Sequence, residues 1–303
     1  MNWQAEIEAA AKRIAGHVRR TPVAELTLAG HTVAIKLEHM QHTGTFKARG
    51  AFNALIQGPV PAGGVVAASG GNHGAAVAHA AARLGIPAQI FVPEIAGPSK
   101  IALIERTGAT LTVVPGAYAD ALDAALAHEA RTGAMQVHAY DSVATLAGQG
   151  TCLREWEDQG LDADTVLIAV GGGGLLGGSM AWLNGRRRVV AVEPETSCAL
   201  NAALAAGGPV DVEVSGIAAN ALGARRIGGL CLDLARQTGT TSVLVPDSAI
   251  AEAQRILWRE ARVLVEPAGA TALAALIAGA YVPAPGESLA VLLCGANVAP
   301  EPV

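Results

Sequence analysis

The chain has 303 residues and a formal net charge of −5. This length is enough for two domains, or one large one, with a core that needs no disulfide bonds. A reduced, cytoplasmic environment is predicted because the four cysteines (152, 198, 231 and 294) lie far apart and show no metal-binding spacing, and because the first twenty residues do not resemble a secretory signal. The only basic run is Arg186 to Arg188, so a nucleic-acid partner is excluded.

Short apolar runs rich in valine and isoleucine alternate with alanine-rich helical stretches along most of the chain. This pattern is typical of a parallel sheet that is buried between crossover helices. Strands are expected at residues 65–69, 89–93, 110–114, 165–170, 188–193, 241–246 and 289–294. Helices are expected at residues 73–85, 98–108 and 118–133, each ending in a glycine that suits a left-handed cap.

Residues 267–286 carry no charge and approach the length of a membrane span. The segment is mostly alanine and glycine, with two prolines near its end, so it is only weakly hydrophobic. We therefore predict a buried helix and no membrane partner.

Two places mark a change between α/β units, near residues 58–61 and near residues 141–142. No proline- or serine-rich tether separates them, so the division is expected where the chain crosses between two sheets. We predict an α/β fold with two open, twisted, parallel-type sheets and flanking helices. The larger domain would comprise residues 1–57 and 144–303, and the smaller one residues 58–143.

Lys47 lies in the stretch HTGTFKARG, residues 42–50, just before a predicted helix. The chain has only four lysines, so arginine is its usual cation. A lysine amine can lose its proton when desolvated and then attack a carbonyl group, which a guanidinium cannot do. The pattern thus leaves two interpretations open, a nucleophilic amine and a solvated lysine at a helix start.

Four consecutive glycines, residues 171–174, follow a predicted strand and precede a helix. Such a turn lets several backbone N–H groups converge on an anion at the helix N-terminus, so a phosphate site is predicted. Gly172, Gly174 and Gly177 also satisfy GxGxxG, and Glu193 ends the next strand where a ribose-binding acid would lie. A dinucleotide-binding oxidoreductase is therefore an alternative.

Two further strand ends carry candidate site residues. The turn SGGNHG brings Ser69, Asn72 and His73 to a helix start, where they could receive a carboxylate or a phenolic oxygen. Cys294 lies at the carboxyl end of the last strand, where α/β proteins bind ligands, although a lone thiol is more often structural.

Together these motifs resemble those of the fold-type II pyridoxal-phosphate enzymes, whose architecture is that of the tryptophan synthase β-subunit. They are most similar to the branch that contains serine/threonine dehydratases and serine racemases. The resemblance covers nearly the whole chain and comprises, in order, TGTFKARGA, SGGNHG, GQGT (148–151), GGGGLLGG, VEPAGA (265–270) and CGANV (294–298). The lysine and tetraglycine motifs are specific as a pair, and the last two motifs are supportive.

The resemblance implies a role for each candidate residue. Lys47 would be the Schiff-base lysine, with Phe46 packed near the cofactor and Asn72 donating to the 3′-oxygen of the pyridine ring. Cys294 would face the pyridine nitrogen. The cofactor phosphate would be held by Gly171, Gly172, Gly173, Gly174 and Leu175, and the substrate carboxylate by Ser69, Asn72 and His73.

The activity that the resemblance implies is α,β-elimination. We expect a homodimeric lyase that converts a small β-hydroxy amino acid, of the serine or threonine class, to a 2-oxo acid and ammonia. No metal is expected, because the glutamate of cation-activated relatives is matched by Glu193 but their aspartate is replaced by Ala199.

An amino-acid racemase on the same scaffold is the nearest alternative. In the racemases of this family the second proton-transfer group resembles a serine, and the matching position here is Gly70. We therefore expect elimination to dominate and Gly70→Ser to raise racemisation. Alternatively, Gly70 is glycine because the turn needs its backbone freedom.

Overall fold

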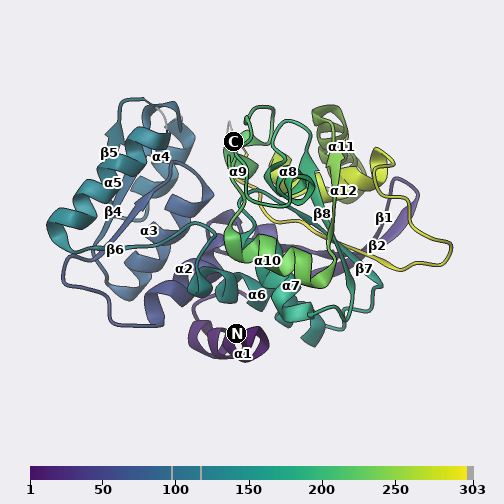
Figure 1. Ribbon diagram of the computed structural model, residues 1–303, viewed down its shortest axis with the longest axis horizontal. Coiled ribbons are helices and arrows are strands. Elements are labelled where there is room, and N and C mark those ends of the chain that lie inside the picture. Colours follow the sequence, from purple (N-terminus) through teal and green to yellow (C-terminus); the bar gives the residue numbers. More distant parts are fainter. Residues whose placement is uncertain (97, 117, 299–303) are drawn as a thin grey trace.

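The computed structural model describes residues 1–96, 98–116 and 118–298. Its strands form two sheets that lie side by side, with helices packed around each (Figure 1). The strands are β1 (Val23–Leu28), β2 (His31–Lys36), β3 (Val65–Ala68), β4 (Ala88–Pro93), β5 (Thr110–Val114), β6 (Met135–Gln136), β7 (Thr165–Ala169), β8 (Arg188–Pro194), β9 (Thr241–Val245) and β10 (Leu289–Leu292). All seven predicted strands are confirmed.

The helices occupy the stretches between these strands. The α-helices are α1 (Trp3–Ile14), α2 (Lys47–Ile56), α3 (Asn72–Leu84), α4 (Pro98–Glu105), α5 (Tyr118–Thr132), α6 (Val143–Asp158), α7 (Gly174–Leu183), α8 (Ala199–Ala206), α9 (Ala219–Leu222), α10 (Gly229–Thr238), α11 (Asp247–Ala261) and α12 (Pro267–Ile277). Three short 3₁₀ helices, η1 (Glu38–Met40), η2 (His42–Gly44) and η3 (Glu94–Ala96), complete the described elements.

The larger sheet has the strand order β1-β2-β10-β7-β8-β9, and the smaller sheet has the order β5-β4-β3-β6. Neighbouring strands are parallel except β1 and β2, which form an antiparallel hairpin at one edge. The valine-rich pattern did not predict this hairpin, because its strands are partly exposed at the sheet edge and alternate in burial. The expected α/β fold with two mostly parallel sheets is confirmed.

The smaller sheet is built from residues 65–136, and the larger sheet uses chain on both sides of that segment. This partition supports the predicted domain division at residues 58–143, whose boundaries stay a proposal. Helices α2 and α6 pack against each other at the junction of the two sheets, so the chain crosses there twice.

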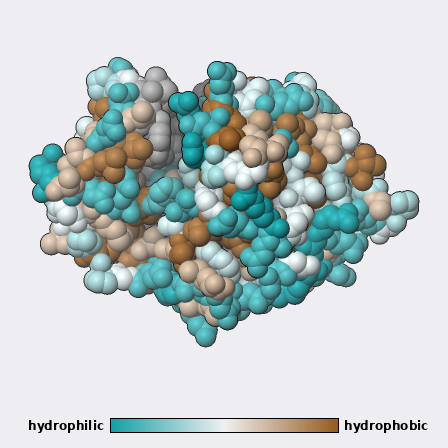
Figure 2. Space-filling view, viewed as in Figure 1, coloured by the Kyte–Doolittle hydropathy of each residue, from teal (hydrophilic) through white to brown (hydrophobic). Residues whose placement is uncertain are grey.

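The larger core surrounds β7, whose five residues are all buried. Helix α12 is buried along nearly its whole length, as predicted for the uncharged alanine-rich segment. Small side chains let this helix approach the sheet closely. Within the described residues, no helix has the length and apolarity needed to span a membrane. On the face shown in Figure 2, hydrophobic and hydrophilic residues are interspersed.

A buried network of four charged side chains connects α2 to β2, η1 and α6. The guanidinium of Arg49 contacts Glu38 at 2.5 Å and Glu155 at 2.9 Å, and Lys36 Nζ contacts Glu155 at 2.7 Å. Arg49, Lys36 and Glu38 are almost completely excluded from solvent. The two positive and two negative charges balance, which is the condition for burying them. Arg49, the member of this network on α2, lies two residues after Lys47.

Candidate active site

A cavity opens at the carboxyl ends of β7 and β10, beside the N-termini of α2, α3, α7 and α12. The carboxyl ends of parallel strands are where open α/β sheets bind ligands. Six stretches of the chain meet there although they are far apart in sequence. The predicted residues that line the cavity are Phe46, Lys47, Asn72, Gly171, Gly172, Gly173, Gly174, Leu175 and Cys294.

Lys47 is the first residue of α2, and its amine is enclosed within the cavity. Nζ donates a hydrogen bond to the carbonyl oxygen of Ala139 at 2.7 Å and lies 5.3 Å from the centre of the Phe46 ring. Burial lowers the pKa of this amine to about 8. Lys36 is also buried, but it is bound to Glu155 as part of the charged network. The environment of Lys47 therefore suits a nucleophilic amine rather than a structural cation.

The glycine turn joins β7 to α7 and forms one wall of the cavity. Helix α7 begins at Gly174, and its first N–H groups have no partner within the helix, so they can bind an anion. Gly173 has φ +93°, and a Cβ atom there would lie 2.5 Å from Cys231 Sγ. A Cβ atom at Gly172 would overlap the ring of Tyr140. Glycine is thus required where the turn packs against its neighbours.

Asn72 opens α3 and reaches the cavity from the smaller sheet. Its Nδ2 atom donates to Glu266 Oε1 at 2.6 Å, and its Oδ1 atom accepts from Asn297 Nδ2 at 2.8 Å. Glu266 begins the turn into α12, and Asn297 follows β10. Asn72 therefore joins the smaller sheet to two segments of the larger one.

Ser69 and His73 are not among the residues that line this cavity. His73 is buried, and its Nε2 atom bonds to the carbonyl oxygen of Val137 at 2.8 Å. Since a carbonyl oxygen only accepts, Nε2 must carry the proton. Burial, assisted by the nearby Lys47 charge, lowers the His73 pKa to about 3, so the ring is neutral and its other nitrogen has no proton to donate. Ser69 Oγ accepts from the N–H of Gly71 at 3.2 Å.

Cys294 lies two residues beyond β10, with its thiol in the cavity. Sγ donates to the carbonyl oxygen of Ala268 at 3.3 Å. Burial raises the pKa of the thiol, and the charge of Glu266 raises it further. Cys294 therefore stays neutral, and all four cysteines of the chain are free thiols.

Glu193, the acid that a dinucleotide site would use, is bound at the start of α8. Its carboxylate accepts from the N–H groups of Leu200 and Asn201, both at 2.8 Å, and from the hydroxyl of Ser242 at 2.5 Å. The side chain thereby caps the start of α8. Both carboxylate oxygens are engaged in this cap, which accounts for Glu193 without a ribose. In the part of the chain that is described, no cluster of three or more metal-binding side chains occurs.

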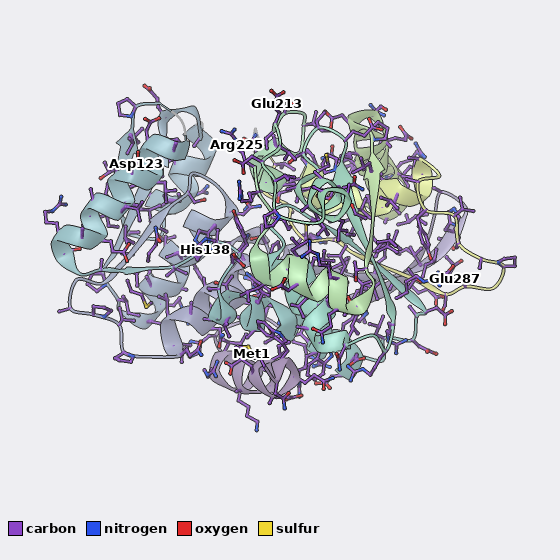
Figure 3. All side chains as sticks on the ribbon, viewed as in Figure 1. Met1, Asp123, His138, Glu213, Arg225 and Glu287 are labelled. Carbon is purple, nitrogen blue, oxygen red and sulfur yellow. The ribbon has the colours of Figure 1, made fainter. Side chains whose placement is uncertain are left out.

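Sequence reasoning did not single out Glu266, Asn297 or Tyr140. Glu266 belongs to the VEPAGA motif and Asn297 to the CGANV motif. The sequence therefore marked both segments, but it assigned no function to these two side chains. Tyr140 lies two residues after His138, which Figure 3 labels at the junction between the two sheets and their helices. Its contact with Gly172 becomes visible only when the two sheets are placed together.

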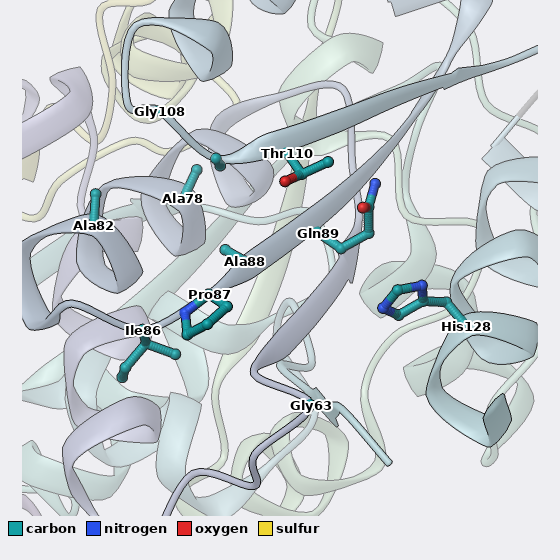
Figure 4. A pocket seen from close by; sticks show the side chains of 11 residues that line it. Gly63, Ala78, Ala82, Ile86, Pro87, Ala88, Gln89, Gly108, Thr110 and His128 are labelled. Carbon is teal, nitrogen blue, oxygen red and sulfur yellow. The ribbon is translucent and has the colours of Figure 1, made fainter. Parts of the chain in front are cut away.

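A second hollow lies on the smaller sheet, away from these residues (Figure 4). It is lined mainly by small side chains, with Gln89, Thr110 and His128 as its polar groups. None of these three is buried. The residues that line this hollow include no lysine and no glycine turn like the one beside Lys47.

The set of groups around that cavity fits pyridoxal phosphate. Helix α7 presents N–H groups for a phosphate, Lys47 presents an amine for the aldehyde, and Asn72 and Cys294 present polar atoms for the ring. A comparison with known families agrees, since residues 14–295 match the family described as "Pyridoxal-phosphate dependent enzyme". The chain belongs to this family.

Curated relatives and solved structures specify the branch. Phenylserine dehydratase of Ralstonia pickettii is 36% identical and covers 94% of this chain and 90% of its own length. L-threonine ammonia-lyase of Thermotoga maritima is 33% identical, with 97% of this chain and 75% of its own length covered. The structure of maize serine racemase has a TM-score of 0.92, 32% identity and coverage of 97% of this chain and 93% of its own.

These relatives bear out the predicted fold, cofactor and class of enzyme. The protein is a pyridoxal-phosphate-dependent lyase of the dehydratase type. The dinucleotide oxidoreductase is set aside, because the family match and the position of Glu193 both disagree with it.

Proposed function

We propose that this enzyme removes water and then ammonia from a small β-hydroxy amino acid and releases a 2-oxo acid. The single observation that carries the proposal is the enclosed Lys47 amine, held within one cavity with the glycine turn, Asn72 and Cys294. The names of the relatives, a phenylserine dehydratase and a threonine ammonia-lyase, support the same chemistry. Bound pyridoxal phosphate supplies an electron-withdrawing ring that stabilises negative charge at the substrate α-carbon.

Lys47 would bind the cofactor and, once a substrate amine has replaced it, remove the α-proton at Nζ. Its lowered pKa suits both tasks, because the neutral amine is the reactive form. The N–H groups at the start of α7 would hold the phosphate. Asn72 would donate to the 3′-oxygen of the cofactor ring. The carboxylate of the substrate would be received by Ser69 and by the backbone N–H groups of the turn that includes Asn72. His73 would contribute to that turn through its backbone alone, since its ring bonds to Val137.

Cys294 would set the preference for elimination. A neutral thiol facing the ring nitrogen cannot keep a full proton there, so the ring withdraws electrons less strongly and a long-lived carbanion is disfavoured. Rapid departure of a β-hydroxyl group suits such a site. The burial that raises the Cys294 pKa therefore supports elimination.

Racemisation is a second candidate, favoured by the close structural similarity to maize serine racemase. It requires a second proton-transfer group on the other face of the cofactor. Gly70 has no side chain to supply one, and a Cβ atom there would lie 2.3 Å from Ala96 Cβ. The structure thus provides a steric reason for glycine at this position.

A substrate panel tests the proposed function. Purified enzyme loaded with pyridoxal phosphate should release 2-oxo acid and ammonia from at least one of L-serine, L-threonine, 3-hydroxyaspartate and L-phenylserine, and none from L-alanine. Lys47→Ala should lose turnover by several orders of magnitude. Formation of D-serine at a rate comparable with 2-oxo acid would replace the dehydratase by the racemase, and absence of both products would refute the proposal.

A homodimeric, cytoplasmic enzyme is proposed as well. The free thiols suit a reducing compartment. Light scattering of the purified protein at two concentrations tests the dimer, which requires about twice the mass of the 30.5 kDa chain.

A further inference from the structure

Asn72 is held from two sides by residues near the C-terminal end of the chain. Its Nδ2 atom donates to Glu266 Oε1 at 2.6 Å, and its Oδ1 atom accepts from Asn297 Nδ2 at 2.8 Å. A side-chain amide has one donor end and one acceptor end. These two contacts therefore determine which end of the Asn72 amide faces which neighbour.

The direction of this chain of hydrogen bonds is set at both of its ends. Asn297 Nδ2 also donates to the backbone carbonyl oxygen of Thr43 at 2.9 Å. Since a carbonyl oxygen can only accept, the NH₂ group of Asn297 has to face Thr43 and Asn72. The oxygen of Asn72 then faces Asn297, and its NH₂ group faces the carboxylate of Glu266.

Close packing of the backbone around Gly295 and Gly269 fixes the position of Glu266. Its N–H group donates to the carbonyl oxygen of Gly295 at 3.2 Å. A Cβ atom at Gly295 would lie 2.1 Å from Glu266 Oε1, and one at Gly269 would lie 2.3 Å from the Gly295 oxygen. Glu266 is 5% exposed and lines the same cavity as Lys47. The carboxylate is thus seated between α12 and the segment after β10, directly beside Asn72.

We propose that Glu266 and Asn297 are positioning residues for Asn72, and that they keep its second amide N–H aimed at the ring oxygen of pyridoxal phosphate. This proposal rests on the proposed function, from which it takes the role of Asn72. One N–H of the Asn72 amide bonds to Glu266, and the other serves the cofactor. With the amide reversed, its oxygen would face the cofactor oxygen, and two acceptors would meet without a proton between them.

Three variants of the enzyme separate the orientation of the Asn72 amide from the charge of Glu266 and from the packing of both neighbouring side chains. Glu266→Gln keeps an acceptor oxygen for Asn72, whereas Glu266→Ala removes it. Asn297→Asp keeps the shape of the side chain but replaces its donor by a second acceptor, so Thr43 and Asn72 lose their hydrogen bond. Glu260→Ala, at an exposed surface carboxylate, is the control.

The readouts are the dissociation constant of pyridoxal phosphate, titrated into apoenzyme, and the wavelength of the bound cofactor's visible absorption band. Glu266→Ala and Asn297→Asp should raise the dissociation constant about tenfold or more, since each leaves the Asn72 amide without one of the two partners that orient it. Both should also shift the band. Glu266→Gln and Glu260→Ala should change neither readout appreciably, and thermal unfolding of each apoenzyme shows whether it is folded.

Wild-type values of both readouts in Asn297→Asp would overturn the proposal, and so would a loss in Glu266→Gln as large as in Glu266→Ala. If Glu266→Ala fails to fold, Asn297→Asp and Glu266→Gln decide the matter. Failure of the proposed function is distinguishable, because wild-type enzyme would then release no 2-oxo acid while these binding readouts could still be measured.

Discussion

The amine of Lys47 donates a hydrogen bond to the carbonyl oxygen of Ala139 at 2.7 Å. Lys47 begins α2, and Ala139 lies where the chain leaves the smaller sheet for α6. The amine of Lys47 is therefore held at the crossing between the two sheets. The carbonyl oxygen takes one N–H and so restrains the direction of Nζ before any cofactor is bound.

Cofactor attachment should depend on pH through Lys47. Because burial lowers the pKa of its amine to about 8, the neutral nucleophile is scarce below pH 7 and predominant above pH 9. The rate of attachment to apoenzyme should rise with pH and level off with a midpoint near 8. Stopped-flow absorbance after mixing with pyridoxal phosphate measures this, with free N-acetyl-lysine methylamide as the reference for the cofactor's own ionisation.

A rate that keeps rising to pH 10 would show an ordinary, solvated lysine. Borohydride reduction followed by peptide mapping gives an independent check of the same residue. The pyridoxyl group should be found on Lys47 and on none of Lys12, Lys36 and Lys100.

Gly173→Ala should weaken cofactor binding and destabilise the fold. The residue has φ +93°, where a side chain costs about 1–2 kcal/mol, and the added Cβ atom would meet Cys231 Sγ at 2.5 Å. Gly185→Ala is the matched control, because Gly185 also has positive φ but has no atom within 4 Å of the added Cβ. Urea unfolding and cofactor titration of both variants should show the larger loss at Gly173, and equal losses would assign the whole effect to backbone strain.

Arg49→Met should be strongly destabilising. It leaves the buried carboxylate of Glu38 without the guanidinium that contacts it at 2.5 Å, and breaking such a pair costs about 3–5 kcal/mol. Arg154→Met, at a surface ion pair, should cost no more than about 1 kcal/mol. Chemical denaturation of both variants and of wild type measures the two losses, and a loss for Arg49→Met no larger than that for Arg154→Met would contradict the prediction.

Gly70→Ser should impair the enzyme rather than raise racemisation. The new Cβ atom would lie 2.3 Å from Ala96 Cβ and 2.9 Å from Val92 Cγ1, so the turn before α3 would have to move. This movement should weaken the binding of pyridoxal phosphate to the single variant. The double variant Gly70→Ser, Ala96→Gly removes the contact with Ala96 Cβ and should recover part of that affinity. Chiral chromatography of the products tests the alternative. More D-serine from the single variant than from wild type, with unchanged affinity for pyridoxal phosphate, would contradict this prediction.

Local patterns were enough to locate the main elements. Seven apolar runs became strands of the two sheets. Inner strands such as β7 are buried on both faces, as a parallel sheet between helices allows, whereas the edge strands β5 and β9 are mostly exposed or half-buried. The hairpin of β1 and β2 escaped prediction because the strands were sought as continuous apolar runs, whereas β1 alternates between exposed and half-buried residues at the sheet edge. Strand β6, with two residues, is too short to produce a periodic pattern.

The individual roles within the cavity could be anticipated only in part. Lys47 and the glycine turn carry their chemistry in a few consecutive residues, so they were visible in sequence. The predicted role of His73 toward the substrate stays a prediction. The structure adds that its ring bonds to the carbonyl oxygen of Val137, since a buried imidazole needs a hydrogen-bond partner. That partner lies 64 residues away along the chain.

The sequence by itself determined the alternation of strands and helices. It also singled out Lys47 as a candidate nucleophile and the glycine turn as a candidate phosphate site, because each of these signals lies within one turn or one strand. The tertiary structure decided which distant groups meet. It placed Glu266 and Asn297 on either side of Asn72, and Tyr140 against Gly172. Such contacts depend on how two sheets and their connecting chain pack in three dimensions, and no local periodicity records that arrangement.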